Sequence, residues 1–456
     1  MAWAAATAPH AIRPGEGKKQ MPQRQRPNVV LIITHDTGRH LGCYGWPVAT
    51  PHLDHLAAEG MRFDRHFCVA AQCSPSRSAL MTGRWPHCNG VMGLAPRWTY
   101  RDGEQTLAQC LGAAGYETAL IGLQHEGSDP ARLGYGFAET SLAGSGFRYV
   151  PGAQSPATVL AGQAAEWLRR RPAAGSRPYL LVVGLAETHR PWDRPEYAGE
   201  PTDAVRVPPY LPDEPQVRAE LAAFAGSVRV ADQAVGDILR AVDATGDTQD
   251  TLVVFTVDHG LAFPRAKGMS YDPGLATALL VRWPGRVAPG SVSDELVCNT
   301  DLFPTLLGAA GVAPPPAVQG QSFLGLLTGG AHKPRDDFFF EMTWHDRYNP
   351  HRGIRTRRHK YIRNFGSLPL VFLPGDIYNS PSGALVRERY YAETRPAEEL
   401  YDLERDPLEH HNLVQDAQYT QVLAGLRARV ERWMEETGDP LLAGPVEAPQ
   451  GPARRP

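Results

Sequence analysis

Four short, nearly continuous apolar runs restrict the fold of this chain more than any other feature. These runs are Val29–Ile33, Thr118–Ile121, Tyr179–Leu185 and Thr251–Val257. Such runs are typical of parallel strands that helices cover on both faces. Apolar residues at helical steps of three and four recur in Ala157–Arg170, Val217–Ala244 and Asp301–Gly308. Strands that alternate with helices predict an α/β fold with a doubly wound sheet, and Asp301 is expected to cap the third helix.

The chain beyond residue 332 follows a different pattern. Runs that fit antiparallel strands are Phe338–Glu341, Gly353–Thr356 and Lys360–Asn364, and a helix is expected near Ala417–Glu435. We therefore divide the chain into a disordered tail over residues 1–26, a large α/β domain over 27–332, a smaller α+β domain with an antiparallel sheet over 333–440, and a Pro-rich tail over 441–456.

Composition excludes several classes of protein. The chain has 46 Lys and Arg against 49 Asp and Glu, a formal net charge of −3, which argues against nucleic acid or an anionic membrane as partner. Its six cysteines are too few for a disulfide scaffold. The basic residues near the start follow the Ala-rich stretch, the reverse of a secretory signal, and no run approaches the roughly 18 apolar residues of a membrane span. We expect a cytoplasmic protein.

Chemically active side chains follow all four apolar runs. They are His35, Asp36, His125, His189, Asp258 and His259. Because ligands bind outside the carboxyl ends of strands in open α/β sheets, these side chains are expected to meet at one edge. Polar residues at any single strand end are ordinary loop residues, but four ends that each carry a His favour a site. Asp36, Asp258 and His259 offer the oxygen and nitrogen ligands that suit a divalent cation.

The stretch Cys73–Arg84 holds a second candidate feature. Pro75 suits the first turn of a helix, with Cys73 or Ser74 as the cap. Cys73 would then lie beside the free N–H groups of the helix start, which stabilise an anion, and Arg77 adds donors for an oxyanion. Judged from these residues alone, an ordinary cysteine, either a low-pKa thiol or a buried small residue, is as good an interpretation of Cys73 as a functional one.

The same stretch resembles the signature of type I sulfatases, C-x-P-S-R followed by S-x-L-x-T-G-R, in which the Cys is converted to formylglycine. The resemblance continues through PNVVLIITHD, ATPHLDHLAAEGMRFDRHF, FTVDHG and ELYDLERDPLEHHNL. Within the family, the chain looks most like the heparan N-sulfatase (N-sulfoglucosamine sulfohydrolase) branch, through CSPSRSALMTGRWPHCNGVMGL, VPPYLPDEPQVRAELA and RGIRTRRHKYIRN. The resemblance implies an alkaline-phosphatase-like sulfatase fold, with a large, mixed but mostly parallel sheet flanked by helices and a smaller C-terminal α+β domain.

The resemblance also implies roles for single residues and a small sulfated saccharide as substrate. Cys73, converted by a formylglycine-generating enzyme, would supply the nucleophile, and the catalytic residues would be Cys73, Arg77, His125, His189 and Lys267. A divalent metal ion, Ca²⁺ by the family pattern or else Mg²⁺ or Mn²⁺, would be held by His35, Asp36, Cys73, Asp258 and His259. Substrate contacts would come from His189, Lys267 and Arg352.

Two departures from the family pattern affect these expectations. The usual Asp-Asp pair after the first strand is His35-Asp36 here, and an imidazole is a poor ligand for Ca²⁺, so ligation by His35 is left open. The family's G-K-x-H reads Gly122–His125 with Leu123 in place of the Lys, which removes one cation from the anion pocket.

Other residues keep two interpretations. Arg352, in a basic run that ends at Arg363, either grips an acidic saccharide or lies on the solvated face of a strand. Trp192, Tyr210 and Trp344 either line a sugar cleft or pack locally.

Three functions are therefore considered. The leading hypothesis is a formylglycine-dependent sulfatase that hydrolyses a sulfate ester or sulfamate of an amino sugar or glycan. The alternative is a phosphonate monoester or phosphodiester hydrolase of the same superfamily, whose single Asp after the first strand and later Asp-His pair fit Asp36, Asp258 and His259. The third is a non-catalytic protein that binds sulfated sugars, for which Leu123 is the only indication.

Overall fold

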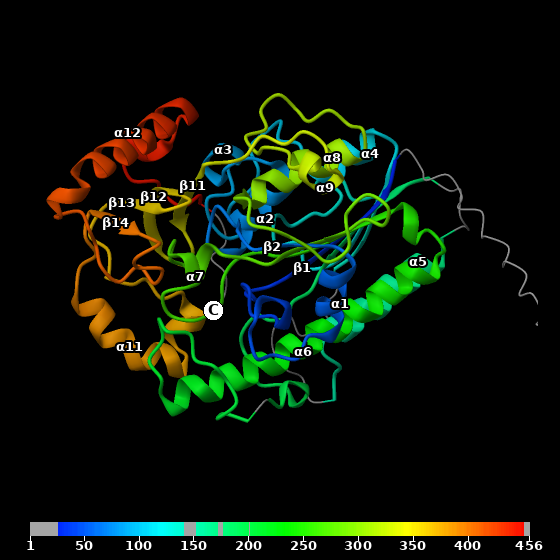
Figure 1. Cartoon of the computed structure of the whole chain (residues 1–456), viewed down its shortest axis with the longest axis horizontal. Helices are drawn as coiled ribbons and strands as arrows, with labels where there is room; N and C mark the ends of the chain where they lie inside the picture. The colour runs from blue at the N-terminus through cyan, green and yellow to red at the C-terminus, as the bar shows by residue number, and fades with distance from the viewer. Residues whose placement is uncertain (1–25, 141–151, 172–176, 200, 451–456) are drawn as a thin grey trace, which may run out of the picture.

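The computed structural model describes residues 26–140, 152–171, 177–199 and 201–450. Most of the tail predicted for residues 1–26, and the last six residues of the tail predicted for 441–456, lie outside this range. An eight-stranded and a four-stranded sheet organise the described chain, with a two-stranded sheet of β3 and β10 beside them, and helices pack on the two larger sheets (Figure 1).

The large sheet has eight strands in the order β5-β4-β6-β1-β7-β8-β2-β9. Its central strands β4, β6, β1 and β7 run parallel, while β8 runs antiparallel to both β7 and β2. In chain order the strands are β1 Asn28–Thr34, β2 Met61–Phe63, β4 Glu117–Gly122, β5 Phe137–Glu139, β6 Tyr179–Gly184, β7 Thr251–Val257, β8 Leu279–Arg282 and β9 Ser291–Ser293. The four predicted strands are confirmed to within one residue at each end.

Helices cover the large sheet on both faces because alternate residues of its strands point to opposite sides. Val30 and Ile32 of β1 belong to the core beneath one helix layer, and Leu31 and Ile33 to the core beneath the other. The first layer contains α1 Pro51–Glu59, α5 Pro156–Arg169 and α6 Pro215–Ala244. The second contains α2 Cys73–Thr82, α4 Leu107–Ala113, α8 Leu302–Ala309 and α9 Leu324–Thr328 (Figure 1).

The smaller sheet is antiparallel, in the order β11-β12-β13-β14, with bounds Asp337–Trp344, Tyr348–Thr356, His359–Asn364 and Glu398–Asp402. One face packs on α12 Thr420–Thr437 and the other on the large α/β part, so Tyr361 faces the helix while Ile362 faces the large part. The first three strands and α12 were predicted, whereas β14 was not. Short elements complete the described chain: β3 His66–Phe67, β10 Val297–Cys298, α3 Pro86–Asn89, α7 Asp272–Leu275, α10 Gly375–Tyr378 and α11 Pro381–Ala392.

One predicted helix cap is confirmed in position and another is corrected. Asp301 occupies the N-cap position of α8 as predicted, but its side chain accepts hydrogen bonds from the backbone N–H groups of Cys298 and Gln321 and makes no cap bond to the helix. Helix α2 begins at Cys73 itself with Gln72 as N-cap, so Cys73 is the first helical residue and not the cap.

Arg352 does not reach a substrate, which corrects the prediction. Its side chain is fully buried between the two parts of the chain, where Nη2 donates to Asp439 Oδ1 at 3.1 Å and Nε lies 3.3 Å from Glu341 Oε2. His87 Nδ1 lies 2.8 Å from the same Glu341 oxygen. Burial lowers the pKa of His87, but Glu341 outweighs this and raises it to about 10, so two cations balance two carboxylates. The cluster stabilises the fold.

We predict that Arg352→Met destabilises the protein by about 3–5 kcal/mol, because it leaves buried carboxylates without their partner. Urea unfolding measures this change, with Arg432→Met on the exposed face of α12 as a control expected to stay within about 0.5 kcal/mol. If Arg352→Met left the stability unchanged but weakened substrate binding, Arg352 would instead be a substrate-binding residue.

Candidate active site

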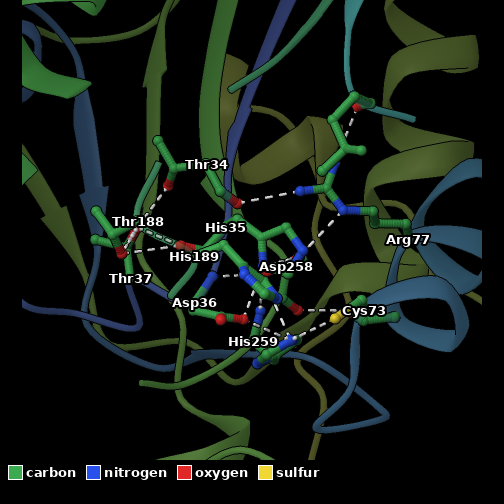
Figure 2. A network of polar contacts seen from close by, with 12 residues as sticks. Thr34, His35, Asp36, Thr37, Cys73, Arg77, Thr188, His189, Asp258 and His259 are labelled. Carbon is green, nitrogen blue, oxygen red and sulfur yellow. Dashed lines mark hydrogen bonds and ion pairs between the residues drawn. The ribbon is translucent and has the colours of Figure 1, made fainter. Parts of the chain in front are cut away.

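The carboxyl ends of β1, β4, β6 and β7 bring the predicted side chains to one edge of the large sheet. His35 and Asp36 follow β1, His189 follows β6, and Asp258 and His259 follow β7. Figure 2 shows these side chains pointing toward one another and toward Cys73 at the start of α2. His125, after β4, lies with its ring centroid 6.1 Å from that of His35. The predicted meeting of strand ends is therefore seen in the structure.

Five of these residues form a tight buried cluster. The ligand atoms of His35, Asp36, Cys73, Asp258 and His259 all lie within 4.8 Å of one another, and all five side chains are buried. His35 Nδ1 is 2.7 Å from Asp36 Oδ1 and 3.3 Å from Asp258 Oδ2. His259 Nε2 is 3.0 Å from Asp36 Oδ1 and 3.5 Å from Cys73 Sγ. The two carboxylates thus share both imidazoles.

Backbone geometry holds this cluster. Asp36 has φ of 54°, in the left-handed region that few residues other than Gly adopt, and its N–H donates to Asp258 Oδ1 at 2.9 Å. The same oxygen accepts the N–H of His259 at 2.9 Å. His125 also has a positive φ, of 58°. Such strain, of order 1–3 kcal/mol at each residue, is typical of functional sites whose surroundings fix the backbone.

The charges of the cluster are strongly coupled. Burial raises the pKa of Asp36, but His35 and Lys267 outweigh it and hold the pKa well below its usual range. Burial also raises the pKa of Asp258, but His35, His259 and Arg77 outweigh it and lower the pKa below its usual value. Burial lowers the pKa of His35, yet the two carboxylates raise it to about 10, and they raise the pKa of His259 as well.

This donor set fits a divalent cation. Without a cation, the two carboxylates are balanced by protons on buried imidazoles, which a metal ion would displace on binding. Asp36 and Asp258 supply the oxygen ligands that suit Ca²⁺, Mg²⁺ and Mn²⁺, and an imidazole ligand suits the softer Mn²⁺ better than the hard ions Ca²⁺ and Mg²⁺. The residues present therefore fit a metal ion.

Cys73 stands where an anion is stabilised. Burial raises the pKa of its thiol, but Lys267 and His35 outweigh it and hold the pKa well below the ordinary value. Its place at the first position of α2 adds free backbone N–H groups. Helix α2 is fixed beside the cluster because the hydroxyl of Ser76 donates to the carbonyl oxygen of Asp258.

Arg77 lies behind the cluster. Its Nε donates to Asp258 Oδ2 at 3.1 Å and its Nη1 to the Leu123 carbonyl at 3.3 Å. The guanidinium is buried and does not line the cavity described below. Its visible role is to hold Asp258 and the end of β4 in position, which differs from the predicted oxyanion contact.

Lys267 links the cluster to the cavity. Its Nζ lies 2.9 Å from Asp36 Oδ2 and 2.8 Å from Asp376 Oδ2. Burial lowers the pKa of Lys267, but the two carboxylates outweigh this and raise it well above its ordinary value. Lys267 therefore stays charged.

His189 lines the same cavity as Lys267 but is uncharged. Burial and the nearby Lys267 lower its pKa to about 4, so it is neutral at pH 7. Its Nδ1 donates to the carbonyl of Arg190, and its Nε2 lies 3.9 Å from Asp376 Oδ2.

A cavity of about 620 Å³ opens above Cys73. Its polar lining includes Cys73, Arg97, His125, His189, Lys267, His345, Asp346 and Asp376, and two tryptophans, Trp98 and Trp344, form an aromatic wall. A second hollow, of about 670 Å³, lies beside α12, but its cations Arg363 and Arg427 are paired with glutamates. We place the active site at the cavity above Cys73, because the buried ionisable side chains lie there.

The C-terminal segment shapes the aromatic wall. Trp344 Nε1 donates to the carbonyl of Val446 at 2.8 Å, and Arg97 Nε donates to the carbonyl of Pro449 at 2.8 Å. Val446 packs in the small cluster that contains Trp98. Val446 and Pro449 of the predicted tail thus lie against residues of the cavity wall.

Sequence reasoning missed His345 and Asp376. His345 directly follows β11 of the antiparallel sheet, where the strand-end rule for open α/β sheets does not apply. Asp376 lies in α10, a helix of four residues that is too short to carry a periodic signal. Trp344 lines the cavity, whereas Trp192 stacks on Phe263 with ring centroids 5.3 Å apart, the local packing named as its alternative. Leu123 does not line this cavity.

Comparison with known proteins decides the family. The Sulfatase family model matches residues 27–312, and that of the N-sulphoglucosamine sulphohydrolase C-terminal region matches residues 259–372. The chain belongs to the sulfatase family. Members are sulfuric ester hydrolases, so the predicted enzyme class is confirmed and the non-catalytic alternative falls away.

Curated relatives of this sulfatase cover most of its length. Human N-sulphoglucosamine sulphohydrolase is 31% identical over 92% of this chain and 93% of its own. An ulvan-active sulfatase of Formosa agariphila is 25% identical over 93% of this chain and 77% of its own. Human arylsulfatase A is 30% identical over 85% of this chain and 83% of its own.

Solved structures confirm the sulfatase fold. A protein in complex with its substrate D-glucosamine-2-N,6-O-disulfate has a TM-score of 0.70 and 20% identity, covering 91% of this chain and 98% of that one. The phosphonate monoester hydrolase of Agrobacterium radiobacter has a TM-score of 0.72 and 22% identity, covering 92% and 97%. At these identities both show the fold alone.

Sulfatases generally use a metal ion and a formylglycine, and the buried cluster of this sulfatase is a possible metal site. Within the described part of the chain, no helix is both long and apolar enough to cross a membrane.

We predict that Asp258→Asn abolishes stoichiometric metal binding and lowers activity at least about 100-fold, because it removes a charged ligand and the partner of Arg77 together. Elemental analysis of the purified protein measures the metal content. Asp203→Asn, an exposed acid, is the control and keeps both metal and activity. Full metal content in Asp258→Asn would refute the assigned ligand set.

Proposed function

We propose that this chain hydrolyses sulfate esters or sulfamates of a sulfated amino sugar, using a formylglycine made from Cys73 and a divalent metal ion. The observation that carries the proposal is the position of Cys73, which lines the cavity and also belongs to the cluster of carboxylates and imidazoles. A nucleophile here would meet both substrate and metal.

The two absent groups supply the central chemistry. Formylglycine, as its hydrate, would supply an oxygen nucleophile, and the cation would polarise the transferred group. A formylglycine-generating enzyme is the partner required for maturation.

The remaining residues bind and orient the substrate. Lys267 presents a permanent charge to the cavity and would bind a sulfate oxygen, while His125 would lie beside the same oxygens. His189 is neutral in the free protein. The negative charge of a bound sulfate would raise the pKa of His189, because it stabilises the protonated imidazole. The protonated His189 would then donate its proton to the leaving amine or alcohol.

Two features support an amino sugar as substrate. Human N-sulphoglucosamine sulphohydrolase matches nearly the whole chain, and the C-terminal model of that protein matches residues 259–372. The cavity also has the size and the mixture of aromatic and polar walls expected for a saccharide.

The identity of the metal follows from His35. A fully buried imidazole so close to both carboxylates favours a cation that accepts nitrogen, and we therefore propose Mn²⁺ ahead of Ca²⁺ or Mg²⁺ when His35 ligates. If His35 only hydrogen-bonds Asp36, the oxygen-rich remainder suits Ca²⁺.

We predict that mass spectrometry of the peptide containing Cys73, from protein made in its native host, detects the aldehyde or its hydrate. Cys73→Ala should lower activity at least about 1000-fold, since the nucleophile is lost. Cys110→Ala, at a partly exposed thiol on α4, serves as the control and retains activity. A fully active enzyme with an unmodified Cys73 thiol would refute the mechanism.

Phosphonate monoester hydrolysis is the second candidate, because Asp36 followed by the Asp258-His259 pair matches the ligand set expected for it. We predict that kcat/KM for N-sulfoglucosamine or glucosamine 6-O-sulfate exceeds that for a phenyl phosphonate monoester at least about 10-fold. Parallel assays of these substrates with one metal-loaded preparation measure the ratio. Faster phosphonate cleavage would reverse the assignment.

A further inference from the structure

Asp376 is an acid in a cavity proposed to bind an anion. It comes from α10 and lines the cavity together with Lys267 and His189. One oxygen, Oδ2, accepts from Lys267 Nζ at 2.8 Å, and about a fifth of the side chain is exposed to the cavity. The other oxygen, Oδ1, is buried and has no hydrogen-bond partner within the described chain. A buried carboxylate oxygen left without a donor is costly, so this acceptor is expected to gain one when the cavity fills.

A second metal ion does not explain this acid. Asp36, His189 and Asp376 have ligand atoms within 4.8 Å of one another. Lys267 Nζ, however, lies 2.9 Å from Asp36 Oδ2 and 2.8 Å from Asp376 Oδ2, so an ammonium group already occupies the space between the two carboxylates. Lys267 remains charged, which opposes a further cation there.

Sulfate does not explain it either, because two anions repel each other. A carboxylate accepts hydrogen bonds only. Asp376 is one side chain farther from the metal cluster than Lys267, which stands between it and Asp36. The carboxylate therefore faces the part of the substrate that lies next to the sulfate and carries donors.

We propose that Asp376 determines specificity by accepting a hydrogen bond from a ring hydroxyl of the sugar that bears the sulfate. The inference rests on the proposed function and extends it from the transferred group to the leaving group. A saccharide offers hydroxyl donors close to its sulfate, whereas an aryl sulfate offers none. Asp376 thus favours sugars over aromatic sulfates, because a site built to hydrogen-bond a hydroxyl disfavours a ligand that lacks it.

The pairing with Lys267 makes the test specific. Removal of Asp376 also removes a partner of Lys267, and that effect acts equally on every sulfate. Recognition of a hydroxyl acts on the sugar alone. The informative quantity is therefore the ratio between a sugar substrate and an aryl substrate, measured in the wild type and in Asp376→Ala.

The experiment uses full-length, metal-loaded enzyme and follows hydrolysis of 4-nitrophenyl sulfate, with N-sulfoglucosamine as competing ligand. Asp376→Ala should raise the inhibition constant of N-sulfoglucosamine about 10- to 100-fold while kcat/KM for the aryl sulfate changes less than about 3-fold. Asp376→Asn keeps an acceptor oxygen and should recover part of the loss. Glu393→Ala removes an exposed acid at the end of α11 and should change neither quantity.

Two results would overturn the proposal. An equal loss of affinity for N-sulfoglucosamine and of kcat/KM for the aryl sulfate would mean that Asp376 acts only through Lys267. An unchanged inhibition constant of N-sulfoglucosamine would mean that Asp376 does not contact the sugar.

Mono-deoxy analogues of N-sulfoglucosamine provide a second measurement. One of them should bind wild type about 10-fold more weakly than the parent, yet bind Asp376→Ala as tightly as the parent does. If wild-type enzyme is inhibited by N-sulfoglucosamine without hydrolysing it or any other sulfated sugar, the proposed function fails, and the inhibition constants still decide the role of Asp376.

Discussion

The burial of two carboxylates, Asp36 and Asp258, at one edge of the large sheet is the constraint on which the site depends. Neither side chain has access to water, and their closest oxygens share the same two imidazoles. Two negative charges so placed are tolerable only when positive charge or hydrogen-bond donors surround them. The protein supplies Lys267 and Arg77 for this purpose, along with backbone N–H groups that the left-handed conformation of Asp36 helps to aim.

This constraint connects fold to chemistry. The parallel order of β4, β6, β1 and β7 brings four strand ends together, and α2 adds Cys73 from the opposite side. The two buried carboxylates, which are costly to bury unless positive charge surrounds them, also make the cluster a site for a divalent cation. Lys267 contributes positive charge to the cavity, where it would bind a sulfate. Because Lys267 also contacts Asp36, the metal site and the sulfate site would be adjacent.

How much of this could be predicted depends on the kind of signal. The apolar runs located the central strands because a strand buried on both faces must be apolar throughout. The same runs located His35, Asp36, His189 and His259, since strand ends meet at one edge. The acid Asp376 gave no such signal, because it lies in the four-residue helix α10 on the connection between β13 and β14, and so short a helix shows no period. Arg352 was misread because its basic neighbours suggested a surface, whereas its acid partners Glu341 and Asp439 are 11 and 87 residues away.

The account predicts one arrangement of atoms that diffraction can test. In crystals of the mature enzyme soaked with Mn²⁺ and sulfate, anomalous scattering should place a single ion between Asp36, Asp258 and His259, within bonding distance of an oxygen on residue 73. Sulfate should lie above it against Lys267. An ion found elsewhere, or a cluster that stays free of metal at saturating Mn²⁺, Mg²⁺ and Ca²⁺ alike, would contradict the central claim.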